Sequence, residues 1–240
     1  MPQYLPIGQA AEYLGISEQT LRRWDADGSF KASFISPGGH RFYALADLAK
    51  RTKGIFQIAK EWVVAADPAE PMETFYCPSI EKFKTRLERM AREMEKNEVL
   101  REIGPIATSI AGEIGNNSFD HNIGNWPDVP GAFFAYDLGK RVVALADRGR
   151  GVLTTLRNAK PDLKDDAEAL FVAFTEVMTG RAPEHRGNGL KYVRKAITRY
   201  KLHLRFQSGD AEVELRNGEN EIEPSASPEN LRGSLTLLEF

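Results

Sequence analysis

The segment that most restricts the fold is IGQAAEYLGISEQTLRRWDADG, where two short amphipathic patterns meet at Gly15. Glycine accepts the left-handed backbone that ends a helix, and Ser17 can cap a helix that follows. The next run, KASFISPGGHRFY, places Pro-Gly-Gly between two β-like stretches and predicts a hairpin. A further helix is expected near residues 45–53. The pattern therefore predicts a small helix-turn-helix unit with a hairpin wing.

This unit accounts for only part of the 240 residues, so a second domain is expected. Residues 65–78 are rich in proline and have no clear period, which is typical of a linker. We expect an N-terminal domain at 1–60, a linker at 61–79 and a second domain at 80–240. The second domain begins with a leading helix at 80–103.

The leading helix carries apolar residues that alternate three and four positions apart: Ile80, Phe83, Leu87, Met90 and Met94. Charged residues flank this seam, as in a coiled coil. A seam of this kind can pair two chains, and we expect a homodimer. A helix packed on its own sheet gives the same pattern, so both interpretations remain open.

The rest of the second domain mixes helices with strands. We expect helices near 106–121 and 189–200, a strand pair near 131–134 and 141–146, a mobile-looking stretch to about 186, and closing strands near 202–206, 211–216 and 234–239. The chain as a whole is therefore predicted to be α+β, with an α/β sandwich as its second domain.

Composition indicates an intracellular setting. The net charge is −2, and residues 1–53 are mildly basic. Cys77 is the only cysteine and cannot form an intramolecular disulfide. The N-terminus lacks the pattern of a secretion signal, and no apolar run approaches the length needed to span a membrane. We expect a cytoplasmic protein without membrane contact.

The N-terminal unit has the donors that a DNA reader needs. Arg22 and Arg23 lie in the second helical pattern, where a helix entering the major groove can read guanine or grip phosphate. His40 and Arg41 follow the turn of the hairpin, within reach of a DNA backbone.

The residues TLRRWDADGSF and SPGGHRFY, together with IGQAAEYLGIS, resemble the winged-helix DNA-binding domain of the MerR and excisionase superfamily. The resemblance implies double-stranded DNA as partner, a recognition helix at 17–26 and a wing at 31–43. It also implies that Trp24 and Phe42 belong to the core and do not contact DNA.

In AGEIGNNSFDHNIG, Glu113 and Asn117 are four residues apart and share one face of a helix. An amide oxygen can complete a Mg²⁺ shell, and a carboxylate can orient water for attack on a phosphoryl group. Glu113 is therefore the candidate catalytic residue and Asn117 the candidate metal ligand.

Two glycine-spaced loops complete the pattern. In LADRGRG, Asp147 ends an apolar run and could accept a hydrogen bond from an exocyclic amine, while Gly149 and Gly151 let the backbone approach a base or sugar. The second loop could face phosphate at the start of a helix. Its candidate residues are Arg186, Gly187, Asn188, Gly189, Leu190 and Lys191.

In this order, the three motifs resemble the N, G1 and G2 boxes of the GHKL ATPases, which include gyrase B, histidine kinases and MutL, over roughly residues 100–240. The resemblance implies ATP and Mg²⁺ as ligands and a lid at 157–185. The apolar stretch AEALFVAFTEVM in this lid could contact a protein partner. In the closing strand GSLTLLEF, either Ser234 or Thr236 could support the adenine-binding acid.

These features favour a DNA-binding regulator that responds to ATP, with hydrolysis as an open question. Residues 80–110 contain no histidine, which argues against a histidine kinase. NNSFDHNIG is also similar to the N box of anti-sigma-factor serine kinases, so a serine/threonine kinase localised by its DNA-binding head is the alternative. A nucleotide-free dimerisation module is a third interpretation.

Overall fold

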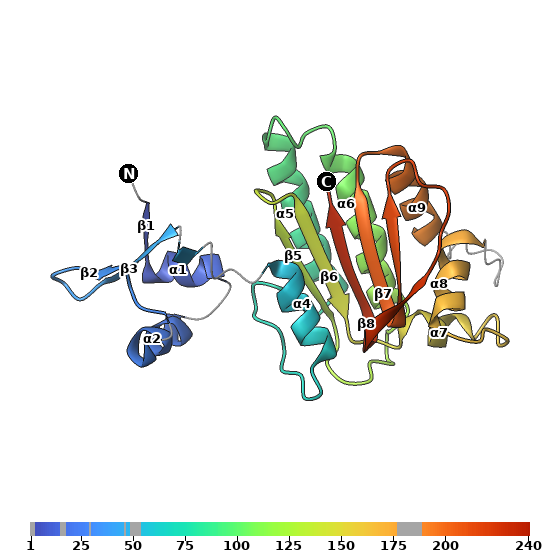
Figure 1. Cartoon of the computed structure of the whole chain (residues 1–240), viewed down its shortest axis with the longest axis horizontal. Helices are drawn as coiled ribbons and strands as arrows, with labels where there is room; N and C mark the ends of the chain where they lie inside the picture. Colours follow the sequence, from blue (N-terminus) through green and yellow to red (C-terminus); the bar gives the residue numbers. More distant parts are fainter. Residues whose placement is uncertain (1–2, 15–17, 29, 46, 49–53, 177–188) are drawn as a thin grey trace. The chain divides into compact units, whose positions relative to one another are not determined.

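The computed structural model describes residues 3–14, 18–28, 30–45, 47–48, 54–176 and 189–240. The chain forms two compact units, Met1–Gly54 and Ile55–Phe240 (Figure 1). In the first unit the element order is β1 (Tyr4–Pro6), α1 (Ile7–Leu14), α2 (Glu18–Asp27), β2 (Phe34–Ile35) and β3 (Arg41–Ala44). The three strands form an antiparallel sheet in the order β1-β3-β2.

The first unit has its own small core. Its buried members come from both helices, from β3 and from the segment after β3: Ala10, Ala11, Leu14, Leu21, Tyr43 and Leu48. The expected recognition helix is α2, and the expected hairpin is β2 and β3 with the turn between them. The helix expected at 45–53 lies mostly outside the described residues.

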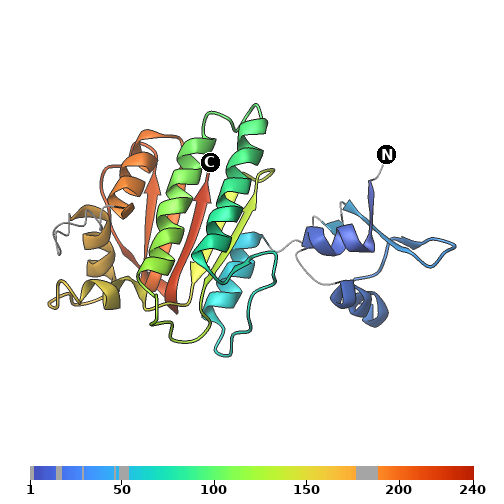
Figure 2. The same cartoon turned by 180° about the vertical axis from the view of Figure 1, so that it is seen from behind.

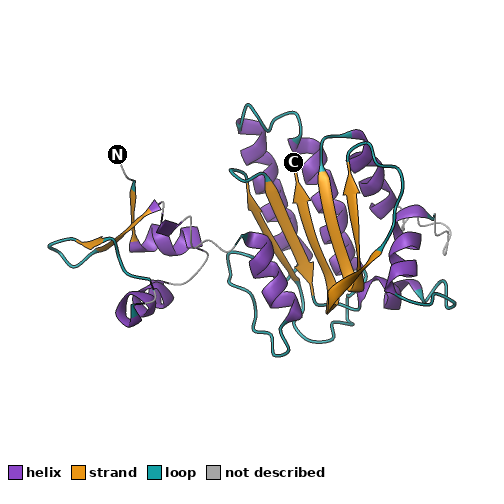
Figure 3. Ribbon diagram, in the orientation of Figure 1, coloured by secondary structure: helices purple, strands orange, loops and turns teal. Residues whose placement is uncertain are grey.

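The second unit is an α/β sandwich (Figure 3). Its helices are α4 (Ile55–Val64), α5 (Ile80–Lys96), α6 (Gly104–Asp120), α7 (Gly151–Leu156), α8 (Asp166–Thr175) and α9 (Gly189–Arg199). Its strands are β4 (Tyr76–Cys77), β5 (Ala132–Asp137), β6 (Val142–Asp147), β7 (His203–Arg216) and β8 (Ser225–Glu239). They form an antiparallel sheet in the order β4-β5-β6-β8-β7.

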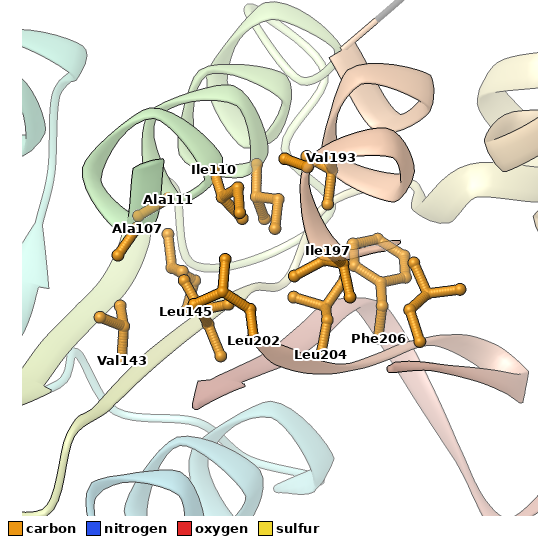
Figure 4. Close-up of a cluster of buried hydrophobic side chains, with 14 of the residues drawn as sticks. Ala107, Ile110, Ala111, Val143, Leu145, Val193, Ile197, Leu202, Leu204 and Phe206 are labelled. Atoms are coloured by element: carbon orange, nitrogen blue, oxygen red, sulfur yellow. The ribbon is translucent and has the colours of Figure 1, made fainter. Parts of the chain in front are cut away.

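The two faces of this sheet are covered differently. Helices α5, α6 and α9 lie on one face, and α4 lies on the other (Figures 1 and 2). Figure 4 shows the core between the first face and its helices. Its labelled side chains are Ala107, Ile110, Ala111, Val143, Leu145, Val193, Ile197, Leu202, Leu204 and Phe206.

The boundary between the units falls at Gly54 and not at residue 60. Helix α4 belongs to the second unit because its apolar side, including Trp62 and Val63, packs on the sheet against residues such as Phe133. The expected linker at 61–79 holds the end of α4 and the edge strand β4. The prolines of this segment indicated a linker, and β4 is too short to show the alternation typical of a strand.

The apolar seam of α5 is used inside the chain. Phe83, Met90 and Met94 are buried in the main core. The Phe83 ring lies so close to Gly115 of α6 that a Cβ added to Gly115 would be 2.1 Å from it. Of the two interpretations of the seam, the packing of α5 on its own chain is correct, and pairing of two chains through this seam is not.

Several elements differ from their expected limits. The strands expected at 202–206 and 211–216 are one strand, β7, with an irregular register at Ser208–Ala211 where Gly209 has φ +62°. The stretch before residue 186 contains α7 and α8. Phe174 of α8 contacts Phe206 edge-on with ring centroids 5.5 Å apart, so part of the expected lid is core.

Cys77 lies in the edge strand β4 and is fully buried. Burial raises the pKa of its thiol, which the nearby Arg86 guanidinium only partly offsets. Across the part of the chain that the structure describes, no helix has the length and apolar character needed to cross a bilayer.

Candidate functional site

Asp147 ends β6 and points into a cavity beside α6. Six residues of β6 pair with β5 on one side and β8 on the other, and this places the carboxylate inside the domain with 4% of the residue exposed. Its Oδ2 accepts hydrogen bonds from the Ser118 hydroxyl at 2.9 Å and the Ser234 hydroxyl at 2.5 Å. Its Oδ1 accepts the Gly149 amide at 2.9 Å.

Burial and hydrogen bonding have opposite effects on the pKa of Asp147. Burial raises the pKa of this carboxyl, while the hydrogen bonds from Ser234, Gly149 and Ser118 lower it. An ionised carboxylate offers about four acceptor positions. The described residues occupy three of them, so one position on Oδ1 can still accept a hydrogen bond from a group in the cavity.

The cavity next to Asp147 has a volume of about 130 Å³. Apolar side chains form much of its wall: Ile114, Val152, Leu156, Leu190 and Phe206. Polar groups also line it: Asn117, Ser118, Asp147, Lys191 and Ser234. A cavity of this kind suits a ligand with a flat apolar part and a polar or charged end.

The glycines of the LADRGRG loop are packed closely. A Cβ added to Gly149 would lie 2.0 Å from the Asn122 amide nitrogen. Gly151 has φ +75°, and the next amide, that of Val152, donates to the Ser208 hydroxyl at 2.9 Å. Gly149 therefore packs against Asn122, while Gly151 lines the cavity with a backbone conformation that other residues rarely adopt.

Asn122 is a site residue that the sequence analysis missed. It is buried and lines the cavity. Its amide nitrogen donates to the Ser118 carbonyl at 2.7 Å, and its oxygen accepts the Arg150 amide at 2.9 Å. Asn122 thus joins the end of α6 to the glycine loop. The available signal was its position four residues after Ser118, which predicts a shared helix face.

Gly233, also missed, lines the cavity beside Asp147. It has φ +80°, and a Cβ there would lie 2.1 Å from the Asp147 carbonyl oxygen. Only glycine fits this contact without a shift of the backbone. Gly233 precedes the serine that donates to Asp147, so β8 both supports and confines the carboxylate.

Glu113, Asn117 and Gly189 are brought together by α6 and the start of α9. A Cβ added to Gly189 would lie 2.5 Å from Glu113 Oε2 and 3.6 Å from Asn117 Nδ2. Asn117 and Gly189 line the cavity. Glu113 is half-buried just behind them. The fold therefore brings the first and third motifs together.

The third motif is only partly visible. Leu190 and Lys191 line the cavity, and burial lowers the pKa of the Lys191 ammonium, opposed by the charge of Glu176. Arg186, Gly187 and Asn188 lie outside the described residues. Their expected contact with a ligand remains a prediction.

Between the two hydroxyls proposed to support the acid, the structure selects Ser234. Thr236 is fully buried opposite Leu145, away from the cavity. Its hydroxyl has no hydrogen-bond partner among the described residues. Ser234 therefore carries the hydroxyl that supports Asp147, and a contact of Thr236 with a ligand stays a prediction.

The Arg148 side chain points away from the cavity and makes its contacts on the other face of the sheet. Its buried guanidinium pairs with Asp128 at 2.8 Å. It also donates to the carbonyl oxygens of Trp62 at 3.0 Å and Val63 at 2.7 Å, at the end of α4. Arg232, which precedes Gly233, reaches the same Asp128 at 3.1 Å.

The basic residues of the first unit are arranged unequally. Arg22 of α2 is exposed and pairs with Glu18 at 3.0 Å. Arg23 is exposed and forms no ion pair with any other described residue. Arg41 pairs with Asp25 of α2 at 2.5 Å, which ties the wing to the helix. His40 is exposed at the turn.

The expected core role of Phe42 is wrong. Alternation along β3 buries Tyr43 and places Phe42 on the opposite face, where its ring stacks on Phe34 at 4.8 Å. Phe34 is 43% exposed. Trp24, by contrast, packs against the core of this unit as expected.

Residues 6–43 match the model of the MerR family regulatory protein. The first unit is a helix-turn-helix domain of the MerR type. This confirms the resemblance expected for the N-terminal segment. An excisionase of Mycobacterium phage D29 is 49% identical over 37 residues, a stretch that covers 15% of this chain and 66% of that protein.

Among solved structures, the chain is similar to the 43K ATPase domain of Thermus thermophilus gyrase B in complex with an aminocoumarin. The match has a TM-score of 0.34 and 16% identity, and it covers 67% of this chain and 40% of the gyrase chain.

Proposed function

We propose that the chain is an ATP-responsive regulator that binds specific DNA sequences, with the nucleotide held in the cavity beside Asp147 and slow Mg²⁺-dependent hydrolysis. The observation that carries the proposal is the buried carboxylate with three donors and one remaining acceptor position. Adenine carries an exocyclic amine that can donate to that position, whereas guanine presents a carbonyl oxygen at the corresponding place.

The walls of the cavity support this assignment. The apolar side chains of Ile114, Val152 and Phe206 provide surfaces against which a planar base can pack. Gly151 lines the cavity and has no Cβ, so its backbone can contact a base or sugar.

The other end of the cavity suits phosphate. Helix α9 begins at Gly189, and the first amides of a helix point outward with a favourable dipole for anions. Lys191 adds a cationic group to the same wall. We propose that Arg186, Gly187 and Asn188 complete this side.

The residues at the junction of α6 and α9 fit a metal-assisted phosphoryl site. Asn117 offers an amide oxygen suited to Mg²⁺, and this ion would neutralise charge on the phosphates when bound. Glu113 lies beside Asn117 and the start of α9. We assign Glu113 the orientation of the attacking water.

DNA binding is assigned to the MerR-type unit. Arg23 and Arg22 on α2 are exposed donors for base edges or phosphates. Arg41 stabilises the wing through Asp25 and can present its remaining donors to the backbone. Because a unit of this size contacts few phosphates, tight binding requires a second copy on a spaced half-site.

Isothermal titration calorimetry of the full chain tests the central premise. ATP and ADP, each with and without Mg²⁺, are compared with GTP. The proposal requires binding of adenine nucleotides and much weaker binding of GTP. Equal affinity for ATP and GTP, or no heat with either, contradicts it.

A further inference from the structure

The cavity and α4 lie on opposite faces of the sheet, and β6 and β8 reach both where Asp147 pairs with Ser234. Asp147 and Gly233 line the cavity. Their sequence neighbours, Arg148 and Arg232, both donate to Asp128 on the other side. A displacement of Asp147 or Gly233 at the cavity is therefore coupled to the position of Asp128.

The contact between Asp147 and Gly233 leaves little room for independent motion. The 2.1 Å that would separate a Cβ on Gly233 from the Asp147 carbonyl oxygen means that the two backbones already touch. Backbones in direct contact transmit a displacement from one to the other.

Arg148 carries this link to α4. Its side chain is 5% exposed. It holds the carbonyl oxygens of Trp62 and Val63, which belong to the last turn of the helix. A cation at the C-terminal end of a helix satisfies groups that lack partners within the helix and interacts favourably with its dipole.

Helix α4 is the first element of the second unit. It begins at Ile55, directly after Gly54, the last residue of the MerR-type unit. It also packs on β6 and β8 through an apolar cluster that includes Ala59, Ala146 and Leu235. Helix α4, which follows the first unit in the chain, thus packs on β6 and β8, the two strands that contribute Asp147 and Gly233 to the cavity.

We infer that α4, held by Arg148 and Asp128, transmits occupancy of the Asp147 cavity to the DNA-binding unit. This inference rests on the proposed function and names the regulation of that site. Arg148 and Asp128 are positioning residues in it, since neither lines the cavity. Because coupling between two binding sites is reciprocal, DNA changes ATP affinity by the same factor as ATP changes DNA affinity.

The test uses the full chain and the variant Asp128→Asn, which weakens both arginine contacts while keeping the side-chain shape. Lys60→Ala is the matched control, because Lys60 also ties α4 to the body of the unit, through an ion pair to Glu229 at 2.6 Å. Should Asp128→Asn fail to fold, Arg232→Ala is used, since this arginine side chain is 53% exposed.

Two quantities are measured for each protein: ATP affinity by calorimetry, and amide hydrogen exchange of residues 55–64 with and without ATP and Mg²⁺. In the parent, ATP is expected to change exchange in α4 at least ~5-fold, the lower end of typical allosteric couplings. Asp128→Asn binds ATP within ~3-fold of the parent but loses most of this response. Lys60→Ala keeps it.

DNA affinity supplies the second readout, with a duplex selected by the full-length protein from a random-sequence pool. The ratio of affinities with and without ATP is expected to approach one in Asp128→Asn and to stay at the parent value in Lys60→Ala. Binding of ATP without any response in α4 overturns the inference alone. The inference is also overturned if ATP changes hydrogen exchange in α4 of Asp128→Asn as much as in the parent, or if Lys60→Ala loses this response to the same extent as Asp128→Asn. Absence of ATP binding overturns the proposed function as well.

Discussion

Replacing Gly233 by alanine should damage both stability and nucleotide binding, and Gly218 provides a matched control. Both glycines have positive φ, +80° at Gly233 and +82° at Gly218. An added Cβ meets nothing within 4 Å at Gly218, but at Gly233 it would lie 2.1 Å from the Asp147 carbonyl oxygen. The two substitutions therefore share backbone strain and differ in steric overlap.

The magnitudes follow from these two contributions. Placing alanine in the left-handed region costs about 1–2 kcal/mol at either position. Overlap with a closely packed neighbour adds about 1–3 kcal/mol at Gly233. The entropy that alanine removes from the unfolded chain is common to both variants and cancels in the comparison. Gly233→Ala should therefore be less stable than Gly218→Ala by about 1–3 kcal/mol.

Urea unfolding of the full chain, followed by circular dichroism, gives this difference. Calorimetry with ATP gives the difference in nucleotide affinity between the two variants. Gly233→Ala displaces Asp147 and should weaken ATP binding at least ~10-fold, about 1.4 kcal/mol, while Gly218→Ala should bind ATP like the parent. Equal losses of stability in the two variants would refute the packing explanation. Parent-like ATP affinity in a folded Gly233→Ala would refute the role of this contact in the site.

Three further predictions concern charge and catalysis. Asp147→Asn should weaken ATP binding at least ~10-fold. Because the folded-state pKa of Asp147 is raised, the stability of the parent should fall relative to this variant as pH rises from about 4 toward 7. A difference in urea unfolding that does not change with pH would contradict this. Glu113→Ala should keep ATP affinity within ~3-fold but abolish phosphate release, and release at the parent rate would exclude its role. In DNA-binding assays at several salt concentrations, Arg23→Ala should cost about 1–3 kcal/mol and relax sequence preference, whereas Arg41→Ala should weaken all sequences and lower the salt slope by about one; equal losses for Arg23→Ala on selected and scrambled duplexes would rule out base reading.

Local patterns predicted the elements of the fold well where the period was long enough to read. The three-and-four spacing of apolar residues placed the start of α5 correctly, although the helix ends at Lys96 and not at 103. The apolar run before Asp147 placed β6 within one residue of its limits. The two-residue strand β4 could not be found, since its pairing with β5 depends on residues more than fifty positions away. Its prolines pointed to a linker instead.

The candidate site divides in the same way. Asp147 and the glycines that follow it could be identified because their types and spacing are visible in the sequence. The roles of Asn122 and Gly233 could not, because each depends on a contact between segments far apart in the chain. The same applies to the choice of Ser234 over Thr236, which only the register of β8 against β6 decides.

The burial of Cys77 gives the chain a built-in reporter of its own fluctuations. The thiolate is the form of cysteine that attacks an alkylating reagent. The Cys77 sulfur is covered by the pairing of β4 with β5, and the pKa of its thiol is raised. Alkylation must therefore wait until the edge of the sheet opens. Since the chain has a single cysteine, the rate of alkylation directly measures how often that edge detaches, and no engineered label is needed.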